Sequence, residues 1–330
     1  MFQLLKNRDF LLSLSIVLGL VAGGGAKWTR DLVIPALAVV MTVSVMGIPG
    51  SIFRSPQALI MPTVIGLIFN YGIHGGTVLA LSRLFIQEEA LRAGFVIVTA
   101  VPPAVAVIPF SILLKGDGPF SLIATVGCYL GALILMPVIT FGLLGSGYAD
   151  EGKLVWIMIE LILGPLLVSR WLRYSGWSNR VEPYKGTVTN WGFFLVTYTI
   201  VGLNRSVFLN QPWSILPVFL VALVAIFLLG FLIEKIGRLL GVDPAKRISL
   251  ILLGTHKNTG LGAGLALTLF NERTALPATV STVFMIVYVI WLSLRQRRQH
   301  KKNPAANEFA EKFIFHRVFK KVPGFRRKPF

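Results

Sequence analysis

One stretch of the chain combines residue types that could bind a small molecule or an ion in an apolar environment. The sequence GTHKNTGLGAGLAL, residues 254–267, places Lys257 between His256 and Asn258, followed by Thr259. A lysine without a partner at the centre of a bilayer costs on the order of 3 kcal/mol. The surrounding glycines let a helix unwind, which is tolerated at that depth only where the backbone lines a cavity or is buried in protein. Either Lys257 extends to a nearby water interface, or these residues face a polar crevice and bind a substrate or an ion; we favour the crevice.

A second apolar stretch contains a cluster of prolines. The sequence AVPPAVAVIPF, residues 100–110, includes Pro102, Pro103 and Pro109. Each proline removes a backbone donor and disturbs the carbonyl group four residues earlier. The carbonyl oxygens released near Pro102 and Pro103 could coordinate a cation or water, although a simple kink would explain the prolines equally well.

Other polar residues lie within apolar segments. Glu160 is either a proton site or ion-pair partner of a lysine, or a residue near the outer interface. His74 and His256 are single histidines, which are more often packing residues than titrating sites. Further residues could line the crevice, although hydrogen bonds between helices would also explain them; they are Asn70, Thr125, Tyr129 and Asn190. Cys128 is the only cysteine, so an internal disulfide or a cysteine metal cluster is excluded, and we expect no metal.

The composition predicts an all-α polytopic membrane protein. Hydrophobic residues make up 55% of the 330 residues and charged residues only 14%, with a mean hydropathy of +0.73, whereas soluble domains average about 25% charged residues. The net charge of +18 does not indicate nucleic-acid binding, because residues 295–330 carry 12 Lys and Arg against Glu308 and Glu311. A basic tail directly after the last span is typical of a cytoplasmic segment near anionic lipid. We expect it to be either an amphipathic surface helix or a partly disordered basic segment.

Apolar runs separated by charged residues, proline or glycine predict ten transmembrane helices. They cover residues 10–25, 31–49, 57–81, 91–114, 119–144, 154–173, 188–204, 213–236, 247–270 and 275–294. Before the tail is counted, Lys and Arg favour one side of the predicted membrane by twelve to seven when the N-terminus is placed inside. We therefore expect both termini in the cytoplasm and a plasma (inner) membrane location.

The two halves of the chain resemble each other at an offset of 155 to 156 residues. Pro62 matches Pro217, and Asp117 matches Glu272. Because each half has five spans, an odd number, the second repeat must be inverted relative to the first. We expect residues 1–150 to form one five-helix repeat, residues 151–294 the inverted repeat, and residues 295–330 the basic tail. Broken fourth and ninth helices in an inverted repeat are typical of a transporter with a midplane site.

The residues in these segments resemble the bile acid:sodium symporter family. The similarity is clearest in KNTGLGAGLALTLFNERTALPATVSTV, which is like the ninth helix and following loop, and in VPPAVAVIPFSILLKGDGPFSLIATVGCYLGALILMP, which is like the fourth and fifth helices. It covers roughly residues 5–295. The resemblance implies a panel domain and a core domain, with broken helices four and nine crossing where substrate and ions bind.

The sequence departs from that family at the sodium ligands. Where the family carries a glutamate and a glutamine on the ninth helix, this chain has Leu253 and Lys257. Val107 and Ile108 replace a Ser-Asn pair on the fourth helix. The family's hydroxyl ligands on the fifth helix would fall at Cys128 and Tyr129, and Thr125 nearby retains a hydroxyl group. A lysine ammonium at this place would repel sodium. Burial favours the neutral form of a lysine, so proton coupling is chemically feasible.

These observations predict a secondary active transporter of small organic anions, independent of sodium, coupled to protons or working by exchange, with no cofactor. The proposed binding residues are Lys257, Asn258, Thr259, His256, Thr125, Pro102 and Pro103. The alternative is a transport-inactive sensor or scaffold whose basic tail binds lipid or a partner. An enzyme is not expected, because the apolar segments contain no paired carboxylates, HExxH motif or Ser/His arrangement. A channel would need rings of like charge or a carbonyl filter, and neither is visible.

Replacing Lys257 with alanine should abolish flux of the native substrate while the protein still inserts into the membrane. The reason is that the variant loses the charge that takes the place of the ion. Flux of radiolabelled organic anions in proteoliposomes, normalised to inserted protein, measures the effect. Flux at the wild-type rate would contradict this role.

Overall fold

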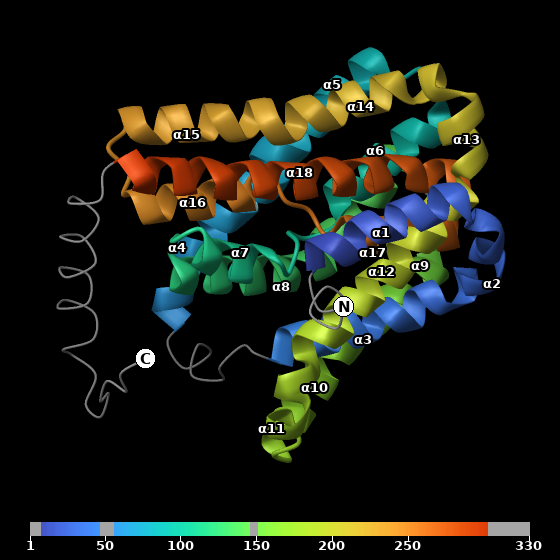
Figure 1. Ribbon diagram of the computed structural model, residues 1–330. Helices are drawn as coiled ribbons and strands as arrows, with labels where there is room; N and C mark the ends of the chain where they lie inside the picture. The colour runs from blue at the N-terminus through green and yellow to red at the C-terminus, as the bar shows by residue number, and fades with distance from the viewer. Residues whose placement is uncertain (1–7, 47–55, 146–150, 303–330) are drawn as a thin grey trace. The chain divides into compact units, whose positions relative to one another are not determined.

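A computed structural model describes residues 8–46, 56–145 and 151–302 (Figure 1). Within these ranges the regular elements are all helices, and a single isolated β-bridge joins Pro103 to Lys257. Contacts divide the chain into a unit of residues 1–286 and a unit of residues 287–330. The lipid-binding role expected for the basic tail falls mainly on residues 303–330, which lie outside the described residues.

The first half of the chain contains helices in each of the five predicted segments. Helix α4 continues into a π-helical stretch, η5, and then into α5, and the fourth segment is split into α6 and α7. The bounds are α1 Arg8–Val21, η2 Gly23–Gly25, α2 Ala26–Thr29, η3 Arg30–Leu32, α3 Val33–Met46, α4 Pro56–Leu67, η5 Ile68–Gly75, α5 Gly76–Phe85, α6 Glu89–Ala100, α7 Val107–Leu113 and α8 Gly118–Leu144.

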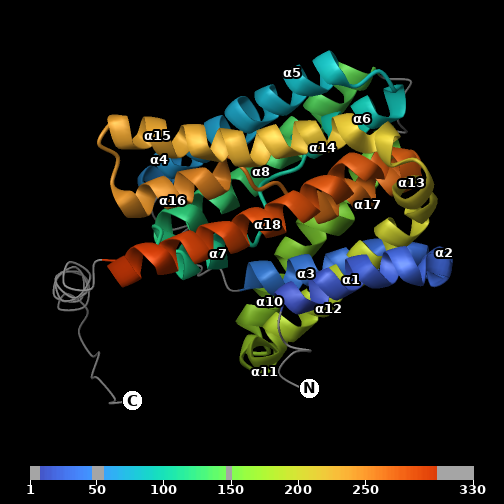
Figure 2. The same ribbon diagram turned by 45° about the horizontal axis from the view of Figure 1, so that its top comes forward.

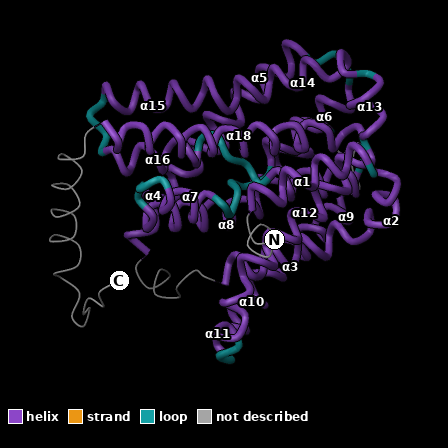
Figure 3. Tube along the Cα trace, viewed as in Figure 1, coloured by secondary structure: helices purple, strands orange, loops and turns teal. Residues whose placement is uncertain are grey.

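The second half likewise contains helices in each of its five predicted segments, and the ninth segment is split into α16 and α17. The bounds are α9 Glu151–Met158, η6 Ile159–Leu163, α10 Gly164–Tyr174, α11 Ser178–Val181, η7 Glu182–Tyr184, α12 Lys185–Leu203, α13 Arg205–Asn210, η8 Pro212–Ile215, α14 Leu216–Leu223, η9 Val224–Leu228, α15 Leu229–Leu239, α16 Pro244–Leu253, α17 Thr259–Leu269 and α18 Glu272–Lys302. Figure 3 shows that short loops join most of these helices.

Six helical stretches among the described residues are long and apolar enough to cross a membrane. They are Gly23–Met46, Leu59–Phe85, Gly118–Leu144, Val155–Tyr174, Pro212–Leu239 and Glu272–Gln296. The fourth and ninth segments fall short of that length because each is broken in the middle. The all-helical, polytopic class is therefore confirmed, whereas ten spans in two inverted repeats remain a prediction.

Two groups of helices can be distinguished by their packing, and Figures 1 and 2 show them from two directions. Helices α1, α3, α10 and α12 pack on one another, and we call them the panel helices. A second group, the core helices, comprises α4 to α8, α14 to α17 and the start of α18. The start of α18 is included because Leu276 and Val280 share a buried cluster with Val78, Phe95 and Val218. Helix α17 packs on α6 and also contacts α3 and α12, so it lies where the two groups meet.

Glycines allow the closest helix contacts within these groups. A Cβ atom on Gly127 of α8 would lie 2.1 Å from the Thr63 hydroxyl oxygen of α4. On Gly94 of α6, a Cβ atom would lie 2.3 Å from the backbone oxygen of Thr274 and 2.8 Å from Cγ of Pro277, both in α18. Small residues let helix backbones approach where the hydrophobic effect does not drive association. Helices α6 and α18 are therefore held at a separation that excludes any side chain at position 94.

The Gly94→Ala variant should unfold at a lower temperature than the wild type. Its methyl group meets backbone and a rigid proline ring, so the helices must separate, and overpacking of this kind costs about 1–3 kcal/mol. Thermal unfolding of the purified protein in detergent measures the effect. Gly76→Ala is the matched control, because a Cβ atom there meets nothing within 4 Å; equal unfolding temperatures for the two variants would contradict the prediction.

Candidate functional site

The two broken helices cross at their breaks. Helix α6 ends at Ala100 and helix α16 at Leu253, and a few non-helical residues follow each. The two stretches pair in antiparallel fashion: the Asn258 N–H donates to the Pro102 carbonyl at 2.8 Å, and the Ala104 N–H donates to the His256 carbonyl at 3.0 Å. Irregular backbone at membrane depth must satisfy its polar groups within the protein. At this crossing each break supplies hydrogen-bond partners for the other.

The Lys257 side chain extends from this crossing towards η5 and the end of α6, and it is 1% exposed. Its ammonium group donates three hydrogen bonds, to Oδ1 of Asn70 at 2.7 Å, to the Thr99 carbonyl at 2.7 Å and to the Val101 carbonyl at 2.8 Å. The Nζ atom also lies 4.1 Å from the centroid of the Tyr71 ring. A lysine ammonium has three donors, so all of them are used. We call these three oxygens and the Tyr71 ring the cradle.

The local sequence explains why the cradle oxygens are available. In a continuous helix the Thr99 carbonyl would accept from the N–H of residue 103, but Pro103 has none. Asn70 lies in the π-helical stretch η5, and π-helical turns are frequent at functional sites. Its amide nitrogen donates to the carbonyl of Leu253, the last residue of α16, at 3.1 Å. The Asn70 amide therefore makes two hydrogen bonds to the ninth segment: it donates to Leu253 just before the break and accepts from Lys257 within it.

Asn258 begins the second half of the ninth segment. Its Oδ1 accepts from the Leu261 N–H at 3.1 Å and caps the N-terminus of α17. Its Nδ2 donates to the Tyr129 hydroxyl oxygen of α8 at 2.8 Å and lies 3.5 Å from the Met41 sulfur of α3. One side chain therefore caps a core helix and contacts a panel helix.

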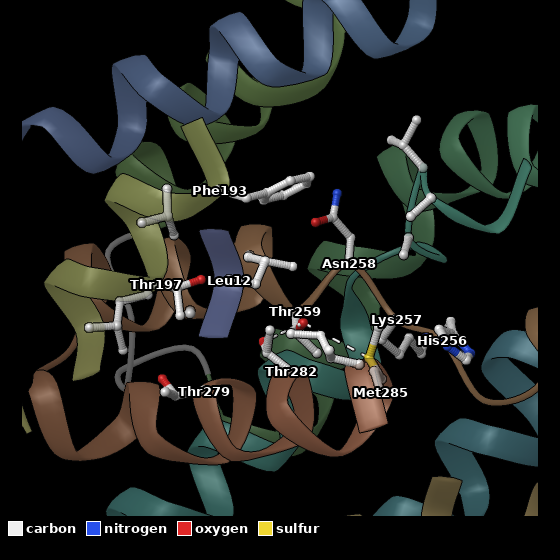
Figure 4. A pocket seen from close by; sticks show the side chains of 18 of the residues that line it. Leu12, Phe193, Thr197, His256, Lys257, Asn258, Thr259, Thr279, Thr282 and Met285 are labelled. Carbon is white, nitrogen blue, oxygen red and sulfur yellow. Dashed lines mark hydrogen bonds between the residues drawn. The ribbon is translucent and has the colours of Figure 1, made fainter. Parts of the chain in front are cut away.

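A pocket lies beside the crossing, between panel and core helices (Figure 4). Leu12, Phe193, Val196, Thr197 and Ile200 line it from the panel side; Ala104, Val105, Ala106, Phe110, His256, Lys257, Asn258, Thr259, Gly260, Ala263, Thr279, Thr282, Met285 and Ile286 line it from the core side. Most of these side chains are apolar. The polar ones are mainly threonines, and the Thr282 hydroxyl donates to the Thr259 hydroxyl at 2.7 Å.

The pocket differs in two ways from the expected polar crevice. Its lining is mainly apolar, and the Lys257 ammonium is directed into the cradle, where all its donors are occupied. Figure 4 shows Lys257 and His256 together at one edge of the pocket, with Phe193 and Thr197 on the opposite side. The reason for the difference is the set of carbonyl oxygens at the first break, which bind the ammonium more completely than an open crevice could.

The other predicted site residues fall in different places. His256 is buried, and its Nδ1 shares a hydrogen bond of 2.8 Å with the Thr255 hydroxyl. Thr125 is buried in α8 and is not a pocket residue. Glu160 lies away from the pocket on an exposed surface, where it accepts a hydrogen bond of 2.9 Å from the Trp156 indole. The Pro102 carbonyl accepts a hydrogen bond at the crossing. Pro103 has no N–H, which leaves the Thr99 carbonyl available to Lys257.

Several important residues were not singled out from the sequence. Tyr71, Thr99 and Val101 complete the cradle, and Phe193 and Thr282 line the pocket. The signal for Thr99 is its position four residues before Pro103, since a proline releases that carbonyl. The pocket threonines carry no comparable sequence signal. Within the described ranges, no group of three or more histidine, cysteine or acidic residues could hold a metal ion.

Crossed, broken helices beside a pocket define a class of membrane transport proteins, and comparison with known proteins gives the family. The model of the SBF-like CPA transporter family matches residues 32–294, so the chain belongs to that family and is an integral membrane protein. The resemblance to the bile acid:sodium symporter family is confirmed by the relatives below, which are transporters rather than enzymes.

Two relatives illustrate the extent of the similarity. The "Probable sodium/metabolite cotransporter BASS3, chloroplastic" of Oryza sativa subsp. japonica is 26% identical over 237 residues, which are 71% of this chain and 56% of the relative. The "Probable sodium/metabolite cotransporter BASS1, chloroplastic" of Arabidopsis thaliana is 24% identical over 279 residues, which are 82% of this chain and 68% of the relative. The chain thus spans little more than half the length of the rice protein.

The contact between Asn70 and Lys257 should appear as a coupling energy in a double-mutant cycle of Asn70→Leu and Lys257→Met. Each single change leaves a buried polar group without its partner, which costs about 1–3 kcal/mol. The double variant should lose less than the sum of the two, by an interaction energy of about 0.5–3 kcal/mol. Denaturation in detergent measures the four stabilities, and additive losses would contradict the contact.

Proposed function

We propose that this protein is a secondary active transporter of small organic anions that works by alternating access and does not depend on sodium. The observation that carries the proposal is the Lys257 ammonium, which is buried where the two broken helices cross. It donates to carbonyl oxygens beside one break and lies next to a pocket formed by both groups of helices. The transport would be driven by protons or by exchange.

The positions of the helix irregularities support two related halves. Helices α6 and α16 begin at Glu89 and Pro244, 155 residues apart, and each stops at a break. The bridged residue pair, Pro103 and Lys257, lies at nearly the same offset. The third segment of each half contains a π-helical stretch, η5 or η9. We propose that these correspondences reflect two five-helix repeats, residues 1–150 and 151–294, inverted with respect to each other.

The charges around the crossing support sodium independence. The names of the relatives include sodium, and the family resemblance expects acidic and amide ligands where this chain has Leu253 and Lys257. A bound ammonium would repel a second cation within a few ångströms. The carbonyl oxygens that could bind sodium are already used by the lysine. We propose that the built-in charge takes the place of the ion.

The pocket supports a small substrate with a substantial apolar part. Its lining combines apolar side chains from both groups with a few threonine hydroxyls. The cavity volume is about 60 Å³, which is room for only a few water molecules. A metabolite would therefore enter when panel and core helices move apart. The nearby positive charge favours an anion over a cation.

The alternative function is a transport-inactive sensor or scaffold. The absence of the expected sodium ligands favours it, whereas a pocket beside an intact crossing favours transport. For either function we propose a plasma-membrane location with cytoplasmic termini, and a basic tail that binds anionic lipid.

Flux in proteoliposomes tests transport and its coupling together. A panel of radiolabelled organic anions is offered with a sodium gradient, a proton gradient, or unlabelled anion inside the vesicles. Uptake should respond to protons or to internal anion and be indifferent to sodium. Uptake that requires sodium would contradict the proposed role of Lys257, and no uptake of any anion under any gradient would favour the sensor.

Lys27→Ala is the matched control for changes at Lys257, because Lys27 is an exposed lysine of α2. Its flux should equal that of the wild type.

A further inference from the structure

We propose that the cradle is an internal cation site which the protein fills permanently with its own Lys257 ammonium, so that this lysine does not carry the coupling proton. The ligand class is a primary ammonium. The part of the inference that concerns coupling depends on the proposed transport function. The existence of the cation site does not.

The first argument is the match between donors and acceptors. An ammonium group has three N–H donors, and the structure places three oxygen acceptors at 2.7 to 2.8 Å from Nζ. A neutral amine would offer only two N–H groups, and its lone pair would then face the third oxygen. Two of the acceptors are backbone carbonyls, which cannot become donors. The geometry therefore fits the protonated form.

The second argument is the character of the neighbouring groups. Among the described residues, the titratable side chains that interact with Lys257 are Tyr71 and His74 from η5 and Cys128 from α8. Next to these lie His256, which interacts with His74, and Tyr129, which interacts with Cys128. None of these is a carboxylate. Glu160, for which a proton site was one of the interpretations from the sequence, is exposed and accepts a hydrogen bond from the Trp156 indole. The surroundings thus stabilise the charge through carbonyl dipoles and an aromatic face rather than through a carboxylate.

The third argument is that the cradle belongs entirely to the core helices. Asn70 and Tyr71 come from η5, Thr99 and Val101 from the end of α6 and the following break, and Lys257 from the break after α16. Asn70 is also bonded to Leu253 within the same group. The panel residues of the pocket, such as Phe193, lie on the opposite side (Figure 4). Movement of the panel against the core would leave all three hydrogen bonds intact.

These arguments give Lys257 a positioning role. It holds the two breaks together as a bound ion would, but it neither dissociates nor exchanges its charge during transport. With no proton step at this site, exchange is favoured over proton coupling as the driving mode of the proposed transporter.

Rescue of the Lys257→Ala variant by small amines tests the cation site. The alanine leaves the cradle empty, and ethylammonium carries the same three donors on a short apolar stem. The unfolding temperature of the purified variant should be lower than that of the wild type by about 3 °C or more. Ethylammonium chloride should restore it in a saturable way. Tetramethylammonium, which has the charge but no N–H donor, and sodium should have no such effect.

Two controls separate specific binding from a general effect of amines. The Lys27→Ala protein should show no response to ethylammonium. In a Lys257→Ala/Asn70→Leu double variant the cradle has lost one oxygen, and rescue should weaken at least tenfold in half-saturating concentration. Equal effects of ethylammonium and tetramethylammonium, or undiminished rescue in the double variant, would overturn the cation site.

If Lys257→Ala cannot be purified, the stability of Lys257→Met and of the wild type can be compared across pH. A permanently charged lysine gives a difference that stays constant between about pH 6 and pH 9, because both folded and unfolded forms remain protonated below the usual lysine pKa of about 10.4. A difference that shrinks as pH falls would show a neutral amine in the fold and overturn the proposal. Neither experiment requires transport, so its outcome is independent of the flux assay.

Discussion

A buried ammonium among carbonyl oxygens is the interaction on which the rest of the site depends. Two helices are interrupted at membrane depth, where unpaired backbone groups are costly. The crossing pairs some of them directly, through Asn258 and Pro102 and through Ala104 and His256. The carbonyls of Thr99 and Val101 remain, and Lys257 satisfies both. The lysine and the breaks therefore stabilise each other, since neither is acceptable in an apolar environment alone.

This arrangement separates the charge from the pocket. The cradle is formed within the core helices, whereas the pocket lies between core and panel helices and is lined by apolar side chains and threonines. A substrate would meet the end of helix α17 and the threonine hydroxyls, with the ammonium behind the crossing. In the proposed transporter, the charge would act on a substrate through space and by holding the backbone at the two breaks.

The family comparison gives the cradle its significance. Relatives named as sodium/metabolite cotransporters match 71 to 82% of this chain, at 24 to 26% identity. The resemblance places sodium ligands at positions that hold Leu253 and Lys257 here. A tethered ammonium and a free cation meet the same need for positive charge among carbonyl oxygens. They differ in one respect that matters for energy coupling, which is that the tethered charge cannot leave.

The sequence by itself determined the membrane class, the helical segments and the two breaks, because hydropathy, prolines and glycines act locally. It also pointed to Lys257, since a lysine in an apolar segment requires a partner. Only the tertiary structure decided which partners it has. Asn70 lies 187 residues away, and the Thr99 and Val101 acceptors are backbone atoms that have no residue type to recognise. Tertiary packing also decides which face of a helix is buried. For this reason Glu160, which the sequence places in an apolar segment as it does Lys257, lies on an exposed surface.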